Sequence, residues 1–521
     1  MTTPKEVVTI LSNAVDAKVH EASRNAKLEL QRILSYKVAG AEHSMSFKQG
    51  TWDGRSSFLN FRSGIFPAGF VHFVAAKMRH KGFEVRLVRK PLPNPLGPEK
   101  PVVDAFPEDP RYDYQRETVS RLVKHGQIIA QVATGGGKSR IARLAFARIN
   151  RPTLFLTTRS ALMYQMKETF EKDLGVQCSV LGDGQFGLVN EEGNTYIKKM
   201  TVGMVQTLTS RLREPNPDDT VADQNRQNAI RNQTIALLSK FEFIILEEAH
   251  EASGNSYFEI MRHCKNAHYR LALTATPFMK DDEESNMRLM AVSGPIGIKI
   301  SEKLLIDRGI LARPFFKIVH LTQRPKHLTR GTGWQSAYRL GIVDNDERNQ
   351  SIVNEVVRAK RHGMTSMILI QQRRHGDVLQ AALKARGVRV RFIQGENDQR
   401  ERAEALRMLG EGKLDAVIGT TILDVGVDVP SVYMIVLAGG GKAEVGTRQR
   451  IGRGLRAKKN GPNKALVVDF DDPFNNHTKE HAMKRLSIIK DTEGFNESII
   501  YGDFDYPALG FTLLDPQPKE L

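Results

Sequence analysis

The sequence predicts an α/β protein with two tandem parallel-sheet domains, preceded by a small α+β domain. Three observations support this prediction. Apolar strand-like runs alternate with helical segments through most of the 521 residues, the alternation occurs twice, and a glycine-rich stretch joins one strand to one helix. A chain of this length exceeds what a single hydrophobic core usually holds, so three domains are expected.

The charge balance points to a polyanionic partner. The formal net charge is +17, and a protein with such an excess often works on nucleic acid, although a basic protein kept soluble by its charge is also common. Only Cys178 and Cys264 are present, without a CxxC pattern, so we expect a reducing compartment and no zinc site. Because no apolar run reaches membrane-spanning length and the N-terminus lacks a signal-peptide layout, we expect a cytoplasmic protein with no membrane partner.

Residues 1–92 are expected to form the small α+β domain. Apolar residues at helical spacing predict a helix between Pro4 and Ser35. Short alternating runs at 57–61 and 83–88 predict strands, and residues 71–77 predict a short helix. A basic cluster in this region suits phosphate contacts, although a solvated charged face explains it about as well. The cluster consists of Lys77, Arg79, Lys81, Arg86, Arg89 and Lys90.

Residues 93–110 contain many prolines, which exclude helix interiors and predict a semi-rigid linker. From 111 to 302, strand candidates alternate with helices and predict the first parallel sheet, whose ligands would collect at the carboxyl ends of the strands. A polar stretch at 211–236 predicts a surface insertion or a mobile helix. The strand candidates are residues 128–133, 153–157, 201–205, 243–246 and 270–274.

Residues 303–475 repeat the alternation and predict a second parallel-sheet domain. This region has no glycine–lysine–serine loop of its own, so one phosphate loop would serve both domains. Residues 476–521 are expected to form a helix at about 477–490 and a tail, whose docking the sequence leaves open. Helices are expected at 376–385 and 399–409. The strand candidates are residues 366–371, 389–393, 416–419, 434–438 and 465–470.

The stretch from Gln127 to Ser139 predicts a phosphate-binding loop between a strand and a helix. Glycines let backbone N–H groups approach a phosphate closely, and the new helix adds the positive end of its dipole. Lys138 would reach the β- and γ-phosphates of a nucleotide, and the Ser139 hydroxyl would hold Mg²⁺. Taken alone, the stretch also fits a glycine-rich turn with a chance Gly-Lys-Ser. The predicted phosphate-binding residues are Thr134, Gly135, Gly136, Gly137, Lys138 and Ser139.

Two carboxylates follow the apolar run 243–246 directly. We assign Glu247 to the metal ion and Glu248 to the base that orients and deprotonates an attacking water. An acidic strand end that begins a loop is the alternative. Farther along, Thr274 and Thr276 close another strand, and their hydroxyls could couple the carboxylates to the second domain through hydrogen bonds.

The second domain offers residues that could complete the site. Gly426 would permit close backbone approach, and Asp428 could accept a ribose hydroxyl. Arg453 and Arg456 are three residues apart, so they share one face if the segment is helical. Phosphoryl transfer needs cations aimed at the charge that develops on the γ-phosphate, and these arginines could supply them. A solvated arginine-rich face is the alternative when the stretch is considered alone.

These segments occur in the order of the motifs of the superfamily 2 helicases, which the chain resembles over about residues 111–470. The resemblance implies two RecA-like domains that close on ATP and Mg²⁺, with nucleic acid bound across both domains. The matching stretches are Gln115, 132–139, 247–250, 274–276, 420–430 and 449–456.

The resemblance also implies roles for further residues. Tyr114 and Gln115 would read the adenine ring, and His250 and Gln449 would couple ATP to the second domain. Arg453 and Arg456 match the arginine-finger positions of the family. Strand contacts would come from Arg159, Gln206, Thr207 and Thr421.

The N-terminal region resembles the small domain of phage UvsW-type helicases at residues 50–55 and 66–70. Residues 305–314 and 341–349 resemble UvsW and the related XPB-like helicases. The resemblance implies a partner that is forked, branched or single-stranded DNA, which the enzyme unwinds or branch-migrates in recombination, repair or fork processing, with strand annealing. A phage-encoded protein would act in the host cytoplasm. Independently, Trp52 beside Arg55 could stack on or wedge against a base, although a buried core tryptophan is commoner.

Two positions depart from the family pattern. Val132 stands where Gly or Ala is usual, and Glu247 stands where the metal ligand is usually Asp. The extra methylene of Glu247 moves its carboxylate, and Mg²⁺ tolerates little error in its octahedron. We still expect an active ATPase, with an altered metal preference. The alternatives left open are a duplex-DNA translocase that does not separate strands, an RNA helicase, and a junction-binding or annealing protein that does not hydrolyse ATP.

Overall fold

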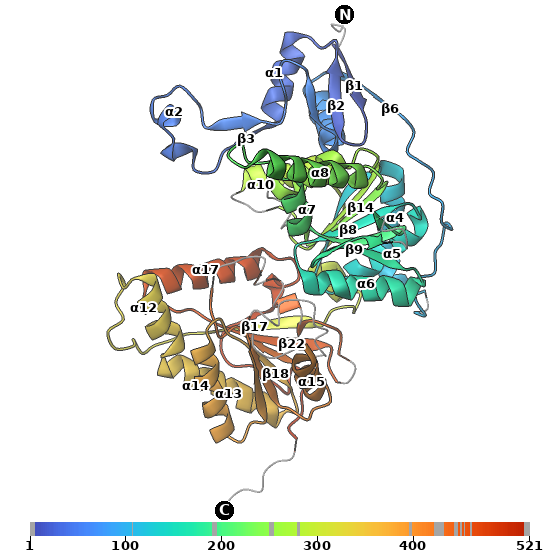
Figure 1. Ribbon diagram of the computed structural model, residues 1–521. Coiled ribbons are helices and arrows are strands. Elements are labelled where there is room, and N and C mark those ends of the chain that lie inside the picture. The colour runs from blue at the N-terminus through green and yellow to red at the C-terminus, as the bar shows by residue number, and fades with distance from the viewer. Residues whose placement is uncertain are drawn as a thin grey trace, which may run out of the picture. The chain divides into compact units, whose positions relative to one another are not determined.

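The computed structural model (Figure 1) describes residues 6–106, 108–189, 195–249, 255–278, 282–394, 399–420, 432–441, 446, 448, 451–452, 454–458 and 461–514. It divides into two compact units. The first comprises Met1–Val132 and Gly137–Ile300, and the second comprises Ala133–Gly136 and Ser301–Leu521. The domain boundaries at 92/93, 110/111, 302/303 and 475/476 stay predictions. No helix in the described part of the chain is long and apolar enough to cross a membrane.

The first unit opens with a four-stranded sheet in the order β5-β2-β1-β6. β1 pairs antiparallel with β2 and parallel with β6. One buried cluster joins this sheet to α1 and α3 through side chains such as Ile10, Leu30 and Met78. The elements are β1 (Val7–Ser12), β2 (Asp16–His20), α1 (Arg24–Ile33), β3 (Ser35–Lys37), α2 (Met45–Lys48), β4 (Arg55–Ser57), β5 (Ile65–Pro67), α3 (Val71–His80) and β6 (Glu84–Arg89).

The helix predicted from Pro4 to Ser35 is wrong in its first half, where β1 and β2 lie. The run Val7–Ile10 is largely β-branched, which favours a strand, and Val8 and Ile10 alternate into the core. The Asn13 carboxamide accepts bonds from two backbone N–H groups and closes the turn between the strands. The predicted strand at 57–61 is also wrong, because β4 ends at Ser57.

An eight-stranded sheet forms the core of the rest of the first unit, in the order β10-β9-β13-β8-β14-β15-β7-β16. Its strands run parallel except at the β9–β10 edge. The five strands predicted here are confirmed to within one residue, while β9, β10 and β16 were not predicted. The strands are β7 (Gln127–Val132), β8 (Thr153–Thr157), β9 (Cys178–Gly182), β10 (Gln185–Phe186), β13 (Met200–Met204), β14 (Phe243–Glu247), β15 (Tyr269–Thr274) and β16 (Ile296–Ile300).

Helices connect these strands, as crossover connections between parallel strands require. The polar stretch 211–236 contributes most of α8, whose last turn is anchored by the buried Leu237 and Leu238. The helices are α4 (Asp113–His125), α5 (Lys138–Ile149), α6 (Ser160–Leu174), α7 (Val205–Leu212), α8 (Val221–Leu238), α9 (Asn255–His263) and α10 (Glu283–Ser293). A short pair, β11 (Leu188–Val189) and β12 (Thr195–Tyr196), forms a separate hairpin.

The proline-rich linker lies extended against α5. The backbone N–H groups of Leu96 and Gly97 donate to the carbonyls of Ile149 and Arg148 at 3.0 Å. A Cβ on Gly97 would lie 1.8 Å from the Ala147 carbonyl oxygen, so only glycine allows this approach. The linker is therefore fixed to the helix that follows the phosphate loop.

The second unit is built on a seven-stranded parallel sheet in the order β19-β20-β18-β21-β22-β17-β23. The strands predicted from 366 to 470 are confirmed to within two residues, and β17 and β23 were not predicted. The strands are β17 (Arg313–Val319), β18 (Ser366–Leu369), β19 (Val390–Ile393), β20 (Ala416–Gly419), β21 (Met434–Val436), β22 (Lys464–Phe470) and β23 (Ile499–Ile500). The helices are α11 (Glu302–Asp307), α12 (Trp334–Tyr338), α13 (Asp346–Arg361), α14 (Arg373–Ala385), α15 (Gln399–Gly410) and α17 (Asn476–Asp491).

The C-terminal segment docks on this second sheet as far as it is described. β23 pairs with the edge strand β17. After β23, four aromatic or aliphatic side chains are buried in the core of the unit, namely Phe504, Tyr506, Leu509 and Phe511. The segment therefore completes both the sheet edge and the core.

Candidate functional site

The phosphate loop lies between β7 and α5, as the sequence predicts. Gly135 and Gly137 have φ angles of 86° and 81°, in the left-handed region that favours glycine. A Cβ on Gly137 would lie 2.4 Å from Nε2 of Gln115. Lys138 and Ser139 begin α5, so the first N–H groups of this helix and its dipole are available to an anion.

The carboxyl ends of three neighbouring strands place the other predicted residues beside this loop. β14 pairs with β15 so that Glu247 lies opposite Leu273, and β15 pairs with β7 so that Thr274 lies opposite Gln131. The carboxylates, the threonines and the phosphate loop therefore share one edge of the sheet.

Glu247 lies in a buried environment that lacks a partner for one of its oxygens. Its Oε2 atom is buried and has no hydrogen-bond partner among the described residues, and the same holds for Oγ1 of Thr276. Burial raises the pKa of Glu247 to about 7, Glu248 adds to the rise, and Lys138 opposes it. An unsatisfied buried carboxylate beside a phosphate loop fits a ligand for a divalent cation.

A phosphate-bound Mg²⁺ would need few protein ligands here. Among the residues that the structure describes, no group of three or more His, Cys, Asp or Glu could hold a metal ion. Mg²⁺ keeps several waters and is commonly held by one or two protein groups plus substrate phosphates. Glu247 and Ser139 fit that pattern, with the phosphates supplied by the nucleotide.

Glu248 has an unusual backbone. Its φ is 49°, which a residue other than glycine adopts only when its surroundings enforce it, and such strain is frequent at functional sites. Its Oε1 atom lies 3.9 Å from Nζ of Lys138, and both side chains are largely buried. The turn after β14 therefore directs this carboxylate at the loop lysine.

Gln115, the predicted adenine reader, is buried and belongs to a polar network. Nη1 of Arg140 donates to its Oε1 atom at 2.7 Å. Arg140 also donates to both carboxylate oxygens of Asp104 in the linker, at 2.8 and 3.2 Å. Tyr114 is buried beside it on α4. Asp104 of the linker thus holds Arg140, which orients Gln115, and the sequence analysis singled out neither Asp104 nor Arg140.

The candidate strand contacts of the first unit lie at the carboxyl ends of β8 and β13, which are neighbours in the sheet. Arg159 precedes α6, and Gln206 and Thr207 lie in the first turn of α7. Nε2 of Gln206 donates to the carbonyl oxygen of Thr158 at 2.9 Å. The two segments that resemble strand-contact motifs are therefore directly connected.

In the small domain, the Nε1 atom of the half-buried Trp52 donates to the carbonyl oxygen of Arg55 at 2.6 Å. The Arg55 guanidinium donates to the carbonyl oxygen of Ser35 and to Glu283 of α10, both at 3.2 Å. Arg55 is therefore part of the contact between the small sheet and the first parallel-sheet domain.

The predicted second-domain residues are mostly outside the described residues. This is so for Thr421, Gly426, Asp428, Gln449 and Arg453, and also for His250 of the first domain. Arg456 is described, and its backbone forms an isolated bridge with Leu311.

Lys458, which the sequence analysis missed, lies two residues after Arg456. Its Nζ atom donates to the carbonyl oxygens of Val432 and Gly454 at 2.5 and 2.7 Å, and burial lowers its pKa to about 7. A single lysine in a basic segment gives no signal of such burial.

Comparison with known proteins agrees with this geometry. The family model described as "Type III restriction enzyme, res subunit" matches residues 109–279, and "Helicase conserved C-terminal domain" matches residues 347–458. A solved fragment of a putative HsdR subunit of a type I restriction enzyme from Vibrio vulnificus YJ016 has a TM-score of 0.51 at 18% identity. That alignment covers 74% of this chain and 67% of the fragment, and it shows the shared fold.

Two curated relatives align with this chain over most of both sequences. The DNA 3'-5' translocase XPB2 of Sulfurisphaera tokodaii is 25% identical over 74% of this chain and 89% of its own length. The ATP-dependent DNA helicase uvsW of Enterobacteria phage T4 is 21% identical over 85% of this chain and 86% of its own length. A putative helicase of Sulfolobus islandicus filamentous virus is 21% identical over 70% of this chain, which spans 64% of that relative. With the two helicase domains in order and these relatives aligned to both, the chain belongs to the superfamily 2 helicases, nucleic-acid-dependent ATPases, as a member of the UvsW- and XPB-like type.

Proposed function

We propose that this helicase unwinds or branch-migrates forked and junction DNA, and that it also anneals complementary strands. One observation carries the proposal. The phosphate loop and the candidate strand contacts Arg159 and Gln206 lie at the same carboxyl edge of one parallel sheet. DNA is the favoured substrate because the XPB2 relative is named a DNA translocase and the uvsW relative a DNA helicase.

Nucleotide binding would use the loop and its neighbours. The N–H groups of residues 134–137 would cradle the phosphates of ATP, and Lys138 would neutralise them. Gln115, which Arg140 orients and which lies beside Tyr114, would select adenine. Ser139 and Glu247 would hold Mg²⁺, which would neutralise charge on the β- and γ-phosphates when bound.

Hydrolysis would depend on Glu248. Nζ of Lys138 lies 3.9 Å from Oε1 of Glu248. As Lys138 turns to the phosphates, Glu248 is released to orient a water and accept its proton. Arg453 and Arg456 would stabilise the charge that develops on the transferred phosphoryl group.

Further residues would connect the reaction to movement along DNA. Coupling would involve His250, Thr274, Thr276 and Gln449, and Gly426 and Asp428 would complete the nucleotide site from the second domain. Nucleic-acid contacts would involve Arg159, Gln206, Thr207, Thr421, Trp52 and Arg55.

The test is the ATPase rate of the full chain with a panel of nucleic acids: single-stranded DNA, duplex, fork, four-way junction and RNA. We expect the fork and the junction to stimulate most, because they offer both a strand for the motor and arms for the small domain. Stimulation by RNA alone would contradict the DNA assignment.

A second candidate is translocation along duplex DNA without strand separation. The observation in its favour is the match of residues 109–279 to a restriction-enzyme subunit. Displacement of a third strand from a triplex, together with no unwinding of a fork, would favour this candidate.

A further inference from the structure

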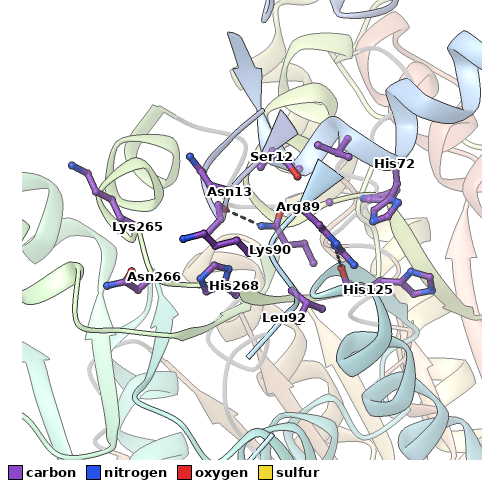
Figure 2. Close-up of a pocket in the computed structure, with 17 residues that line it drawn as sticks. Ser12, Asn13, His72, Arg89, Lys90, Leu92, His125, Lys265, Asn266 and His268 are labelled. Atoms are coloured by element: carbon purple, nitrogen blue, oxygen red, sulfur yellow. Dashed lines mark hydrogen bonds between the residues drawn. The ribbon is translucent and has the colours of Figure 1, made fainter. Parts of the chain in front are cut away.

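A cavity of about 320 Å³ lies in the first unit, where the small sheet meets the first parallel-sheet domain. Side chains from both parts line it (Figure 2), with His72, Arg89 and Lys90 from the small domain and His125, Lys265 and His268 from the sheet domain. Its size is within the range of ligand pockets.

The lining is cationic and lacks compensating carboxylates. Among the described residues that line this cavity, none is acidic. Arg89, Lys90 and Lys265 form no ion pair with any residue that the structure describes, whereas nearby Arg86 pairs with Glu84 at 3.2 Å. Like charges gathered without acids repel one another, so an anion would stabilise the arrangement.

Contacts across the cavity hold Arg89 and the two histidines in place. Nη1 of Arg89 donates to the carbonyl oxygen of His125 at 3.3 Å, a bond that Figure 2 shows, and the ring centroids of His72 and His125 are 5.8 Å apart. Burial lowers the pKa of His72, and the charge of Arg89 lowers it further. The positive charges therefore act on His72 inside the cavity as well as at the rim.

The walls are preformed by close contacts between the two parts. Nε2 of Gln127 donates to the carbonyl oxygen of Ala14 at 2.9 Å. A Cβ on Gly69 would lie 2.2 Å from the carbonyl oxygen of Met290, so the small domain packs here at backbone distance. The Oε1 atom of Gln127 is buried and has no partner among the described groups.

A second hollow of about 520 Å³ adjoins the first and shares His72, His125 and Gln127 with it. It adds Arg121 and Lys124. Arg121 donates a 2.7 Å bond to the acidic residue of this hollow, Glu117, so these two charges offset each other and Lys124 is the net added cation. Two cationic hollows in succession suit a chain of phosphates better than a single phosphate.

This pair of hollows lies at the opposite edge of the sheet from the ATP site. Gln127, His268 and Pro295 are at the amino ends of β7, β15 and β16, whereas the phosphate loop and Arg159 are at carboxyl ends. The hollows are therefore distinct from both sites already described.

We propose that the two hollows bind the phosphodiester backbone of a second DNA arm, separate from the segment at Arg159 and Gln206. The proposal rests on the proposed function, since it takes DNA as the substrate. A branched DNA would then contact both edges of the first sheet domain, whereas a short single strand would contact only the carboxyl edge.

The test measures the affinity of the full chain for a fork and for a short single strand as salt is raised. The variant is Lys90→Ala/Lys265→Ala, which removes one cation from each part. The matched control is Lys172→Ala/Lys240→Ala, since both lysines are exposed in the same unit and line neither hollow. For the fork, the log–log salt slope should fall by about 0.9 for each lysine in the variant only, and the single-strand slope should not change.

An unchanged fork slope, an equal loss in the control, or an equal loss with the single strand would overturn the proposal. If DNA of any form fails to stimulate the wild-type ATPase, the proposed function itself fails, and this inference fails with it. A small free phosphate ligand is distinguished with pyrophosphate on a Lys138→Ala background. Weaker pyrophosphate binding after Lys90→Ala/Lys265→Ala, with no change in the fork slope, would assign the cavity to that ligand instead.

Discussion

Replacing Glu247 by glutamine should stabilise the metal-free protein above neutral pH and change little below pH 5. The folded-state pKa of Glu247 is about 7, against an ordinary value of 4.5. The unfolded chain therefore loses this proton first as pH rises. Wild-type stability falls from pH 4.5 until the folded pKa is passed, and the full cost of burying the charge is present above pH 7. The difference between the two pKa values corresponds to about 3 kcal/mol of unfolding free energy.

The assay is urea unfolding in excess chelator at several pH values from 5 to 8.5, with wild type and Glu247→Gln in parallel. Other titrating groups are common to both proteins, so the difference between the curves isolates this carboxyl. Added Mg²⁺ and ADP should narrow the gap, because a bound cation stabilises the ionised form. Curves that stay parallel across this range would refute the reasoning.

Three further predictions concern other sites. Lys138→Ala should abolish ATP turnover and leave DNA affinity within about twofold, since DNA contacts lie elsewhere; equal loss of both in filter-binding and ATPase assays would contradict this. Asp104→Asn should weaken the hold on Arg140 and raise KM for ATP by roughly fivefold, which is equivalent to about 1 kcal/mol. The variant should also discriminate less against GTP, and its melting temperature should not change. In the protein, Nε of Arg485 donates to Oδ2 of Asp469 at 2.9 Å. Arg485→Met removes this partner and leaves Asp469 as a buried uncompensated charge. It should cost about 3–5 kcal/mol in urea unfolding, and a loss below 1 kcal/mol would rule out that account.

The metal preference can be tested at the same position. Glu247→Asp shortens the side chain by one methylene and restores the usual ligand of the family. Turnover with Mg²⁺ and Mn²⁺ should shift in favour of Mg²⁺ relative to wild type. Undetectable wild-type hydrolysis with either metal would contradict an active ATPase.

The parallel strands were predictable because burial on both faces gives continuous apolar runs. Phe243–Glu247 is such a strand, and its apolar run led directly to Glu247 and Glu248. β17 was missed because it begins with Arg313-Pro314 and contains a lysine. Lys317 is buried there because Glu355 accepts from it at 2.9 Å, a partner 38 residues away that local patterns do not reveal.

The same limit applies to the site. The loop residues 134–139 could be named because phosphate binding fixes their types and spacing. Asp104 could not, because its partner Arg140 lies 36 residues along the chain and a proline-rich linker gives no local signal. The apolar spacing between Pro4 and Ser35 predicts one helix. Spacing alone does not reflect the β-branched content of the first half or the turn at Asn13.

The fixed linker has a thermodynamic consequence. It leads from the small sheet, past backbone bonds to α5, to the Asp104 carboxylate that holds Arg140 and thus Gln115. If nucleotide binding changes, through this path, the affinity of the small sheet for a ligand, linkage requires that this ligand change nucleotide affinity by the same factor. Binding of DNA to the N-terminal sheet would then change ATP affinity, so the linker would couple the two sites as well as space them.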